Sequence, residues 1–322
     1  MVFVAVFSSP AAVALDSGPY SLRQLTEVWL DEVCGPGEGA CLVQLMGSTR
    51  KHSRSQVEAE LRSLRTRENH CSWAILDNLS GEFLGVVQLT NFEHSKNSMN
   101  LAMVLSSERY QDRGIGTAVI DAVLTYAFDG IHLSSVLASV SLNNTRALRL
   151  AEKLGFASGR QYNRAGERHQ RLFIDKLRYI AAMSERLMGE NLDSGKWKFG
   201  FDSGKRRAGL CDHTNSRISL SRHMAQLHAV DQSRQVMYHE IAHALAGAKH
   251  GHDAQWLRIA TDLGYRNERI SSREVDERHA KWLGRCPNGH EYFRYRKPTR
   301  VSSCSKCSRN YDDRFRIVWE QR

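Results

Sequence analysis

We expect three structured parts along this chain: a mixed α/β domain, then an α+β domain, then a small β domain. The first half alternates β-type runs with amphipathic helices, the second half centres on a helix with two histidines, and the last part holds closely spaced cysteines. A chain of 322 residues is also too long for one ordinary hydrophobic core. We place the three domains at residues 1–177, 178–283 and 284–322.

The composition is that of a globular protein, with 41% apolar residues, 25% charged residues and only 5 prolines. There is no stretch of about 18 uninterrupted apolar residues, so we expect no membrane span. No Lys or Arg precedes Arg23, which argues against a secretory signal and favours a first strand at Val2–Phe7. Seven cysteines, an odd number, do not indicate a disulfide framework, and we expect a cytoplasmic protein.

The net charge of +10 is concentrated in the second half of the chain. Residues 1–180 hold 19 Lys and Arg against 18 Asp and Glu, whereas residues 181–322 hold 26 against 17. Within that half, residues 284–322 hold 10 against 4. This balance indicates a polyanionic partner, with DNA the first candidate, and the alternative is a basic surface that meets only solvent.

The order of elements in the first domain follows from periodicity and turn residues. Helical spacing predicts helices at Ser21–Leu30 and Arg54–Leu64, with a break at the glycines of residues 35–39. Three β-type runs separated by turns predict an antiparallel meander, and a later run predicts one more strand. These four runs are Cys71–Leu76, Phe83–Thr90, Ser98–Leu105 and Ser135–Ser141.

A loop with two glycines, Gly114 and Gly116, follows the meander and opens a helix. The glycines let the backbone come close to a ligand, and the N–H groups of the first helical turn suit pyrophosphate oxygens. The alternative interpretation of both glycines is an ordinary loop with positive φ.

This loop and the segment after the next strand resemble the GNAT acyltransferase family. The family's pyrophosphate loop, Q/R-x-x-G-x-G/A, is matched by Gln111, Gly114 and Gly116, and its N-x-x-A helix by Asn144 and Ala147. The resemblance implies a splayed mixed sheet, acetyl-CoA as cosubstrate and an amine as acceptor. It implies that Asn144 lies beside the pantetheine arm and that the backbone amides of residues 113–118 hold the pyrophosphate. The predicted cofactor-binding residues are Gln111, Arg113, Gly114, Ile115, Gly116, Thr117, Ala118 and Asn144.

The chain departs from this family at Ala151, where many members carry the tyrosine that reprotonates the leaving thiolate. Ser141 or a water molecule is the replacement, or the domain is weakly active. Glu93 and His94, near the end of a predicted strand, are candidate bases for the acceptor amine, and the alternative is that both are solvated loop residues.

The second domain is organised around a helix that contains H-E-x-x-H at His239, Glu240 and His243. Positions i and i+4 share one face of a helix, so both imidazoles can approach one ion. Zinc binds neutral imidazole and lowers the pKa of a bound water, and a carboxylate beside it can take the proton. The motif therefore indicates a zinc peptidase with Glu240 as general base. The alternative, two solvated histidines on a surface helix, does not fit the apolar residues around the motif.

A catalytic zinc ion needs a third protein ligand, and the next segment offers two histidines. Asp253 is a predicted N-cap of a helix that ends at Gly264. A histidine just before that helix can turn back towards the motif. We favour His252 and keep His250 as the alternative.

The histidine motif, Trp256 and the upstream β-type runs Trp197–Phe201 and Arg217–Leu220 resemble the SprT-like zinc metalloprotease domain. The resemblance extends over residues 178–322. It implies an α+β zincin-like fold, cleavage of protein that is bound or crosslinked to DNA, and a zinc ion on His239, His243 and His252.

The C-terminal part carries C-x3-H and C-x2-C motifs, which together can bind one structural zinc ion. Short β-type runs at Glu291–Arg296 and Phe315–Trp319 complete a zinc-ribbon pattern, and a domain this small needs the metal to hold it together. Basic residues between the motifs are candidates for nucleic-acid contact. The predicted zinc ligands are Cys286, His290, Cys304 and Cys307, and the basic residues are Arg294, Arg296, Lys297 and Arg300.

The sequence therefore indicates a bifunctional enzyme with one catalytic and one structural zinc ion and with acetyl-CoA as cosubstrate. An N-acetyltransferase is followed by a zinc metallopeptidase whose predicted substrates are DNA-associated proteins. The alternative is a nucleic-acid-binding zinc protein in which one or both enzyme-like domains are inactive scaffolds.

Overall fold

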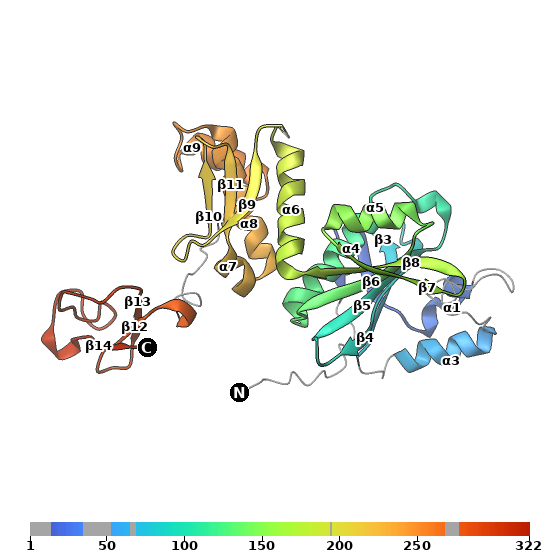
Figure 1. Ribbon diagram of the computed structural model, residues 1–322, viewed down its shortest axis with the longest axis horizontal. Coiled ribbons are helices and arrows are strands. Elements are labelled where there is room, and N and C mark those ends of the chain that lie inside the picture. Colours follow the sequence, from blue (N-terminus) through green and yellow to red (C-terminus); the bar gives the residue numbers. More distant parts are fainter. Residues whose placement is uncertain (1–13, 35–52, 65–68, 194, 268–276) are drawn as a thin grey trace. The chain divides into compact units, whose positions relative to one another are not determined.

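The computed structural model describes residues 14–34, 53–64, 69–193, 195–267 and 277–322 (Figure 1). The chain divides into two compact units between Met183 and Ser184. The predicted strand Val2–Phe7 and the predicted break at residues 35–39 lie outside the described residues. In the part of the chain that the structure describes, no helix is long and apolar enough to cross a membrane.

A mixed sheet forms the core of the first unit. Its strands are β1 (Leu15–Asp16), β2 (Tyr20–Gln24), β3 (Cys71–Asp77), β4 (Phe83–Glu93), β5 (Ser98–Leu105), β6 (Ser135–Ser141), β7 (Ala157–Arg164) and β8 (Glu167–Asp175). Their order in the sheet is β1-β2-β3-β4-β5-β6-β8-β7. Among the described strands of this sheet, only β5 and β6 pair in parallel. The predicted meander is confirmed as β3, β4 and β5, and the predicted later strand as β6.

Helices cover both faces of this sheet (Figure 1). They are α1 (Leu30–Cys34), α3 (Arg54–Leu64), α4 (Ile115–Thr125) and α5 (Thr145–Leu154), with short 3-10 or π turns at Glu27–Trp29, Glu108–Tyr110 and Tyr126–Gly130. On one face, α1 and α3 pack against Ala74 of β3 and Val86 of β4. On the other, Trp73 meets Tyr126 edge to face with ring centroids 5.7 Å apart, which places the C-terminal end of α4 there.

The strands β5 and β6 stay together over a short distance only. Ser98–Asn100 pairs with Ser135–Leu137, and beyond these residues the two strands separate. Each strand remains held by its other neighbour, β5 by β4 and β6 by β8. The approach of β4 to β5 is so close that a Cβ atom on Gly85 would lie 2.2 Å from the carbonyl oxygen of Val104. The sheet therefore opens between β5 and β6.

The predicted helix Ser21–Leu30 is wrong, because Tyr20–Gln24 is the strand β2. Leu22 is fully buried and lies opposite Ile75 of β3. Pairing with β3 satisfies the backbone of this segment, and this tertiary contact overrides the helical spacing of its apolar residues. The predicted helix Arg54–Leu64 is confirmed as α3.

The second unit combines a small sheet with helices. Its elements are β9 (Lys198–Asp202), β10 (Gly209–Asp212), β11 (Arg217–Ser221), α7 (Arg222–Leu227), α8 (Val230–Ala246) and α9 (Ala254–Asp262), preceded by α6 (Lys176–Asn191). The division between the units and the predicted boundary at residue 178 both fall inside α6. The strand order is β10-β11-β9, with β11 parallel to β9 and antiparallel to β10. The predicted strands Trp197–Phe201 and Arg217–Leu220 correspond to β9 and β11.

Two helices form the core beside this sheet. Met237 and Ile241 of α8 are fully buried. Ala242 of α8 packs with Trp256 and Ala260 of α9. The predicted helix after Asp253 is confirmed as α9, and Gly264, with a φ of 93°, follows its end.

A three-stranded antiparallel sheet forms the C-terminal part of the second unit. It consists of β12 (Trp282–Arg285), β13 (Glu291–Arg294) and β14 (Val318–Gln321) in the order β13-β12-β14. The predicted strand Phe315–Trp319 begins only at Val318. Phe315 instead accepts a hydrogen bond from Cys304 N at 2.9 Å, and Ile317 N donates to Ser302 O at 2.9 Å. The residues before β14 are therefore held by the cysteine-bearing segment.

Candidate active sites

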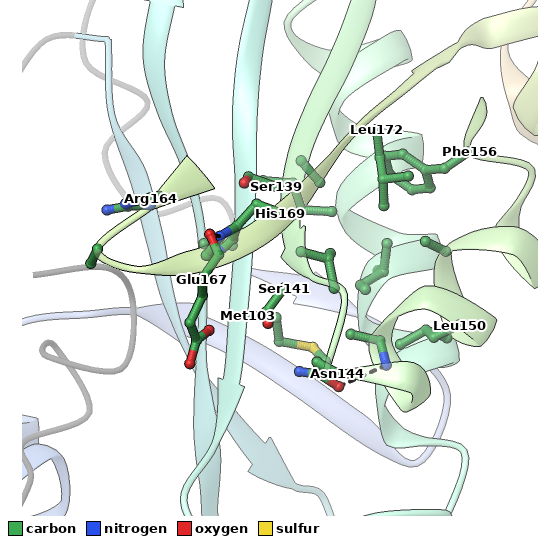
Figure 2. Close-up of a pocket in the computed structure, with 18 residues that line it drawn as sticks. Met103, Ser139, Ser141, Asn144, Leu150, Phe156, Arg164, Glu167, His169 and Leu172 are labelled. Carbon is green, nitrogen blue, oxygen red and sulfur yellow. Dashed lines mark hydrogen bonds between the residues drawn. The ribbon is translucent and has the colours of Figure 1, made fainter. Parts of the chain in front are cut away.

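A cavity of about 490 Å³ lies where β5 and β6 separate (Figure 2). Ala138 and Val140 of β6 line it, and so do Ser139 and Ser141. Successive residues of a strand point to opposite faces of the sheet, so the cavity reaches both faces. One wall is apolar, and the polar side holds Arg164, Glu167 and His169. The apolar wall includes Leu101, Met103, Ile120, Leu150, Phe156 and Leu172.

Of the two predicted loop glycines, Gly116 packs against residues that line this cavity. Gly114 has a φ of 78° and caps α4, a backbone conformation that favours glycine. A Cβ atom on Gly116 would lie 2.7 Å from Leu150 Cδ2 and 3.2 Å from Met103 Cε. Ala118 donates its N–H to Gly114 O at 3.1 Å, so this predicted pyrophosphate donor is already paired. The N–H groups of residues 115–117 have no acceptor within the helix and can face an anion.

The loop is tied to α5 by Arg146. The Arg146 guanidinium donates to Gln111 Oε1 and lies 3.6 Å from Asp112 Oδ2. Arg113 is exposed. Asn144 caps α5, because its Oδ1 accepts a hydrogen bond from Ala147 N at 3.0 Å, and it also lines the cavity. Arg146 thus joins the loop to the N-x-x-A segment, whose Asn144 and Ala147 line the cavity.

Only some of the residues considered for proton transfer line this cavity. Ser141 and Ala151 line it, whereas Glu93 and His94 do not. Glu93 pairs with Lys96 at 2.7 Å, and the hydrogen bond from Lys96 lowers the pKa of Glu93. A carboxylate with a lowered pKa is a weak base.

Two polar residues at the cavity, Glu167 and His169 on β8, are missing from the predicted site. Figure 2 shows both side chains at the polar side of the cavity, near Ser141. No glycine or motif in the sequence marks these two residues as part of a site. Only the pairing of β8 with β6 brings them to the cavity.

Three histidines of the second unit converge on one point. His239 and His243 come from α8, and His252 comes from the loop before α9. Their Nε2 atoms lie 3.2 Å apart for His239 and His243, and 3.1 Å apart for each pair with His252. Tetrahedral zinc with Zn–N bonds of about 2.0–2.1 Å holds its nitrogen ligands about 3.3 Å from one another. The three imidazoles therefore fit one face of a tetrahedral zinc site.

Burial, followed by the neighbouring His243 and His252, lowers the pKa of His239 to about 4. His239 is consequently neutral at physiological pH, which is the form that a metal ion binds. The pKa of His243 is lowered by burial and by the neighbouring His252 and His213.

Trp256 supports the histidine cluster. Its ring centroid lies 4.6–5.2 Å from those of the three histidines. Asp253 caps α9 by accepting a hydrogen bond from Trp256 N at 3.0 Å, and it also binds His250 Nδ1 at 2.7 Å. The structure thus brings His252 to the cluster and pairs His250 with Asp253.

Glu240 lies on α8 with its side chain against β10. The residue is only 7% exposed, and burial raises the pKa of its carboxyl to about 7. A backbone hydrogen bond from Cys211 acts in the opposite direction. A carboxyl group with a pKa near 7 can both accept and return a proton at neutral pH.

The C-terminal motifs form a second cluster of possible metal ligands, Cys286, His290, Cys304 and Cys307. The three sulfur atoms lie 3.2–3.5 Å from His290 Nδ1, and the sulfurs of Cys286 and Cys307 lie 3.9 Å apart. Tetrahedral zinc with Zn–S bonds of about 2.3 Å requires sulfur–sulfur distances of about 3.8 Å and sulfur–nitrogen distances of about 3.5 Å. This donor set fits a closed structural site.

The four predicted nucleic-acid contacts are exposed, and among the described residues none of them forms an ion pair with a carboxylate. Arg294 lies over the ring of Trp319 at 5.8 Å, and Lys297 over that of Trp282 at 5.6 Å. Arg285 differs, because it pairs with two carboxylates. We call these residues the basic group: Arg294, Arg296, Lys297 and Arg300.

Two known families match separate parts of the chain. Residues 38–157 match the acetyltransferase (GNAT) domain, and residues 177–279 match the SprT-like family. The chain contains a GNAT acetyltransferase domain followed by a SprT-like domain, with the Cys/His cluster in its C-terminal part.

Solved structures similar to this chain include acetyltransferases of Vibrio cholerae. Spermidine N-acetyltransferase in complex with CoA and spermine is 17% identical, with a TM-score of 0.45 over 50% of this chain and 98% of its own. A putative ribosomal-protein-serine acetyltransferase is 16% identical, with a TM-score of 0.42 over 51% of this chain and 96% of its own. No curated protein matches the chain.

Proposed function

We propose that this chain is a bifunctional enzyme, an acetyl-CoA-dependent N-acetyltransferase joined to a zincin-like zinc metallopeptidase that acts on DNA-associated proteins. One observation above all supports the peptidase assignment. Three imidazole Nε2 atoms lie within 3.1–3.2 Å of one another, and two of them come from the helix that also carries the buried Glu240. The cavity at the opening between β5 and β6 supports the transferase.

The cavity has the features that acetyl-CoA needs. The first turn of α4 offers backbone N–H groups to the pyrophosphate, and Gly116 lets Leu150 and Met103 of the cavity wall pack directly against this turn. The apolar wall suits the pantetheine arm and the acetyl methyl group. The polar side, which opens on the other face of the sheet, suits the acceptor amine.

In the peptidase, His239, His243 and His252 would hold the zinc ion. Zinc held there supplies a Lewis acid that polarises the scissile carbonyl and lowers the pKa of a water molecule. Glu240 would accept a proton from the attacking water on a carboxylate oxygen and pass it to the leaving amine. The backbone of β10 keeps the carboxylate in position, because Cys211 donates a backbone hydrogen bond to Glu240.

The basic group supports DNA as a partner. Its four cations are exposed and free of carboxylate partners among the described residues, so they can neutralise phosphates. Aromatic rings lie beneath two of them. Contact with DNA would bring the peptidase close to proteins that are already on the DNA.

Zinc per chain, measured by elemental analysis on the wild type and on a His239→Ala, His243→Ala variant, tests the metal sites. We expect two zinc ions in the wild type and one in the variant. One zinc ion in both proteins would contradict the peptidase assignment and favour the alternative of a DNA-binding zinc protein.

Proteolysis of a DNA-binding protein, measured in the presence and in the absence of DNA, then tests the reaction. We expect cleavage that requires DNA, and Glu240→Gln should abolish it while the protein keeps two zinc ions. Thermal stabilisation by acetyl-CoA tests the first unit, because a scaffold without a cosubstrate site should show none.

A further inference from the structure

A polar row crosses three strands at the cavity. Ser141 of β6 lies opposite His169 of β8, and His169 lies opposite Tyr162 of β7. Cross-strand partners point to the same face of a sheet. His169 and Ser141 both line the cavity, together with Glu167 two residues before His169 (Figure 2).

The hydrogen bonds of His169 define its neutral tautomer. His169 Nδ1 lies 3.2 Å from the backbone carbonyl oxygen of Glu167. A carbonyl oxygen only accepts, so Nδ1 carries the hydrogen and Nε2 keeps a free lone pair. Tyr162 stacks on the ring at 5.8 Å and its hydroxyl is hydrogen-bonded to Ser139 Oγ, which fixes the orientation of the imidazole.

Apart from the carboxylate of Glu167, competing proton acceptors are few at this cavity. Ser141 Oγ accepts a hydrogen bond from Asn143 N at 3.2 Å, and the methyl group of Ala151 has no lone pair that could accept a proton. Glu93 is paired with Lys96 and lies outside the lining. Among the described lining residues, His169 is the one imidazole, which is the side chain that most often serves as a general base.

We propose that His169 is the catalytic base of the acetyl transfer, and that it takes a proton from an amine acceptor which enters from the polar side of the cavity. This inference rests on the proposed transferase function. The amine nitrogen attacks the thioester carbonyl, the new C–N bond forms, and the C–S bond breaks. The proton lost by the nitrogen goes to His169 Nε2 and then, through solvent, to the CoA thiolate. The products are an amide and CoA with a free thiol.

A matched pair of variants tests this role, His169→Asn and His132→Asn. His132 is exposed, lies outside the cavity lining and has a φ of 53°, which asparagine tolerates. The acceptor probes are spermidine, a peptide with a free N-terminus and an N-blocked lysine peptide. With the best probe, His169→Asn should lower kcat about 100-fold or more and His132→Asn should not change it. Both variants should keep the thermal stabilisation by acetyl-CoA.

The pH profile separates proton transfer from a structural role. The charged and titratable groups on the same face are Glu167 and Arg171 of β8, and Tyr162 and Arg164 of β7. The acidic limb of kcat/KM should disappear in His169→Asn and remain in His132→Asn. Imidazole in solution should restore part of the activity of His169→Ala.

Nitrogen NMR of histidine-labelled protein gives a readout that needs no activity. Neutral His169 should appear as the Nδ1–H tautomer, and the Nε2–H tautomer would overturn the inference. Equal kcat values for His169→Asn and the wild type would overturn it while the transferase function stands. A wild type that transfers acetyl to no probe would overturn the transferase function itself, and the inference with it.

Discussion

The carboxylate of Glu240 lies directly against Gly209 of β10: a Cβ atom at position 209 would sit 2.8 Å from Glu240 Oε1 and 2.6 Å from Val236 Cγ1. No side chain fits between β10 and α8 at this point. The glycine therefore sets the position of the proposed general base, although it carries no chemistry itself.

Gly209→Ala should displace the Glu240 carboxylate and lower peptidase kcat/KM by about 100-fold, the scale expected for a misplaced catalytic group. Zinc content should remain at two ions per chain, because no histidine ligand is touched. Gly189→Ala is the matched control, since nothing lies within 4 Å of a Cβ atom there. Equal peptidase activity in the two variants would show that the Glu240 position is not limiting.

Gly116→Ala should weaken the binding of acetyl-CoA with little effect on folding. The added methyl group meets Leu150 Cδ2 at 2.7 Å and Met103 Cε at 3.2 Å, and both are flexible ends of side chains that can only move into the cavity. The shift in melting temperature caused by acetyl-CoA measures this effect. Adding Leu150→Ala should restore the shift, and a double variant no better than Gly116→Ala would contradict the explanation.

Cys304→Ser should lower the zinc content from two ions to one and loosen the C-terminal sheet. Cys304 is fully buried in the four-residue cluster, and a domain this small depends on its metal. Cys34→Ser is the control, because Cys34 lies outside both clusters. A chelator cannot replace these variants, since it removes metal from both sites. Two zinc ions in Cys304→Ser would rule out this ligand set.

Replacing the basic group by alanine should weaken DNA binding and reduce its salt dependence. For every phosphate that is no longer neutralised, the slope of log K against log salt should become shallower by about 0.7–0.9. Arg314→Ala is the control, because Arg314 is paired with Asp312 at 2.8 Å. The measurement is the DNA-binding constant of each protein at several salt concentrations. An unchanged slope in the alanine variant would place the DNA-binding surface elsewhere.

Alkaline pH should destabilise the first unit through Cys71. Burial raises the pKa of the Cys71 thiol from its ordinary value of 9.0 to about 12, and burial also raises the pKa of Tyr126 beside it. The folded state holds the thiol proton more tightly, so this contribution to stability is complete below pH 9 and is lost as the pH rises towards 12. At pH 10.5 the loss from Cys71 is about 2 kcal/mol.

Denaturant unfolding of the wild type and of Cys71→Ala between pH 8 and 11 measures this loss. The stability of Cys71→Ala should fall less steeply, so the difference between the two proteins should shrink with pH. Parallel curves of unfolding free energy against pH would mean that the Cys71 thiol does not contribute to the pH dependence of stability.

Sequence patterns were sufficient to predict the site residues where neighbouring positions in the chain determine the geometry. The i, i+4 spacing of His239 and His243 and the C-x2-C spacing at Cys304 determine which side chains face one another within a single turn. The strands of the meander were also predictable, because turn residues separate their β-type runs. Here, short-range geometry decides the structure.

Long-range pairing explains the features that the sequence did not predict. Helical spacing at Leu22 was overridden by pairing with β3, and His169 reaches the cavity only through its pairing with Ser141. The choice between His252 and His250 also depended on a competing partner, because Asp253 holds His250. None of these contacts follows from spacing along the chain.

The cavity that reaches both faces of the sheet has a consequence for the order of kinetic events. Two reactants that enter from opposite faces do not block each other, so neither has to leave before the other arrives. Initial-rate lines for acetyl-CoA and the amine should therefore intersect, as they do when both substrates are bound together. CoA should compete with acetyl-CoA and not with the amine.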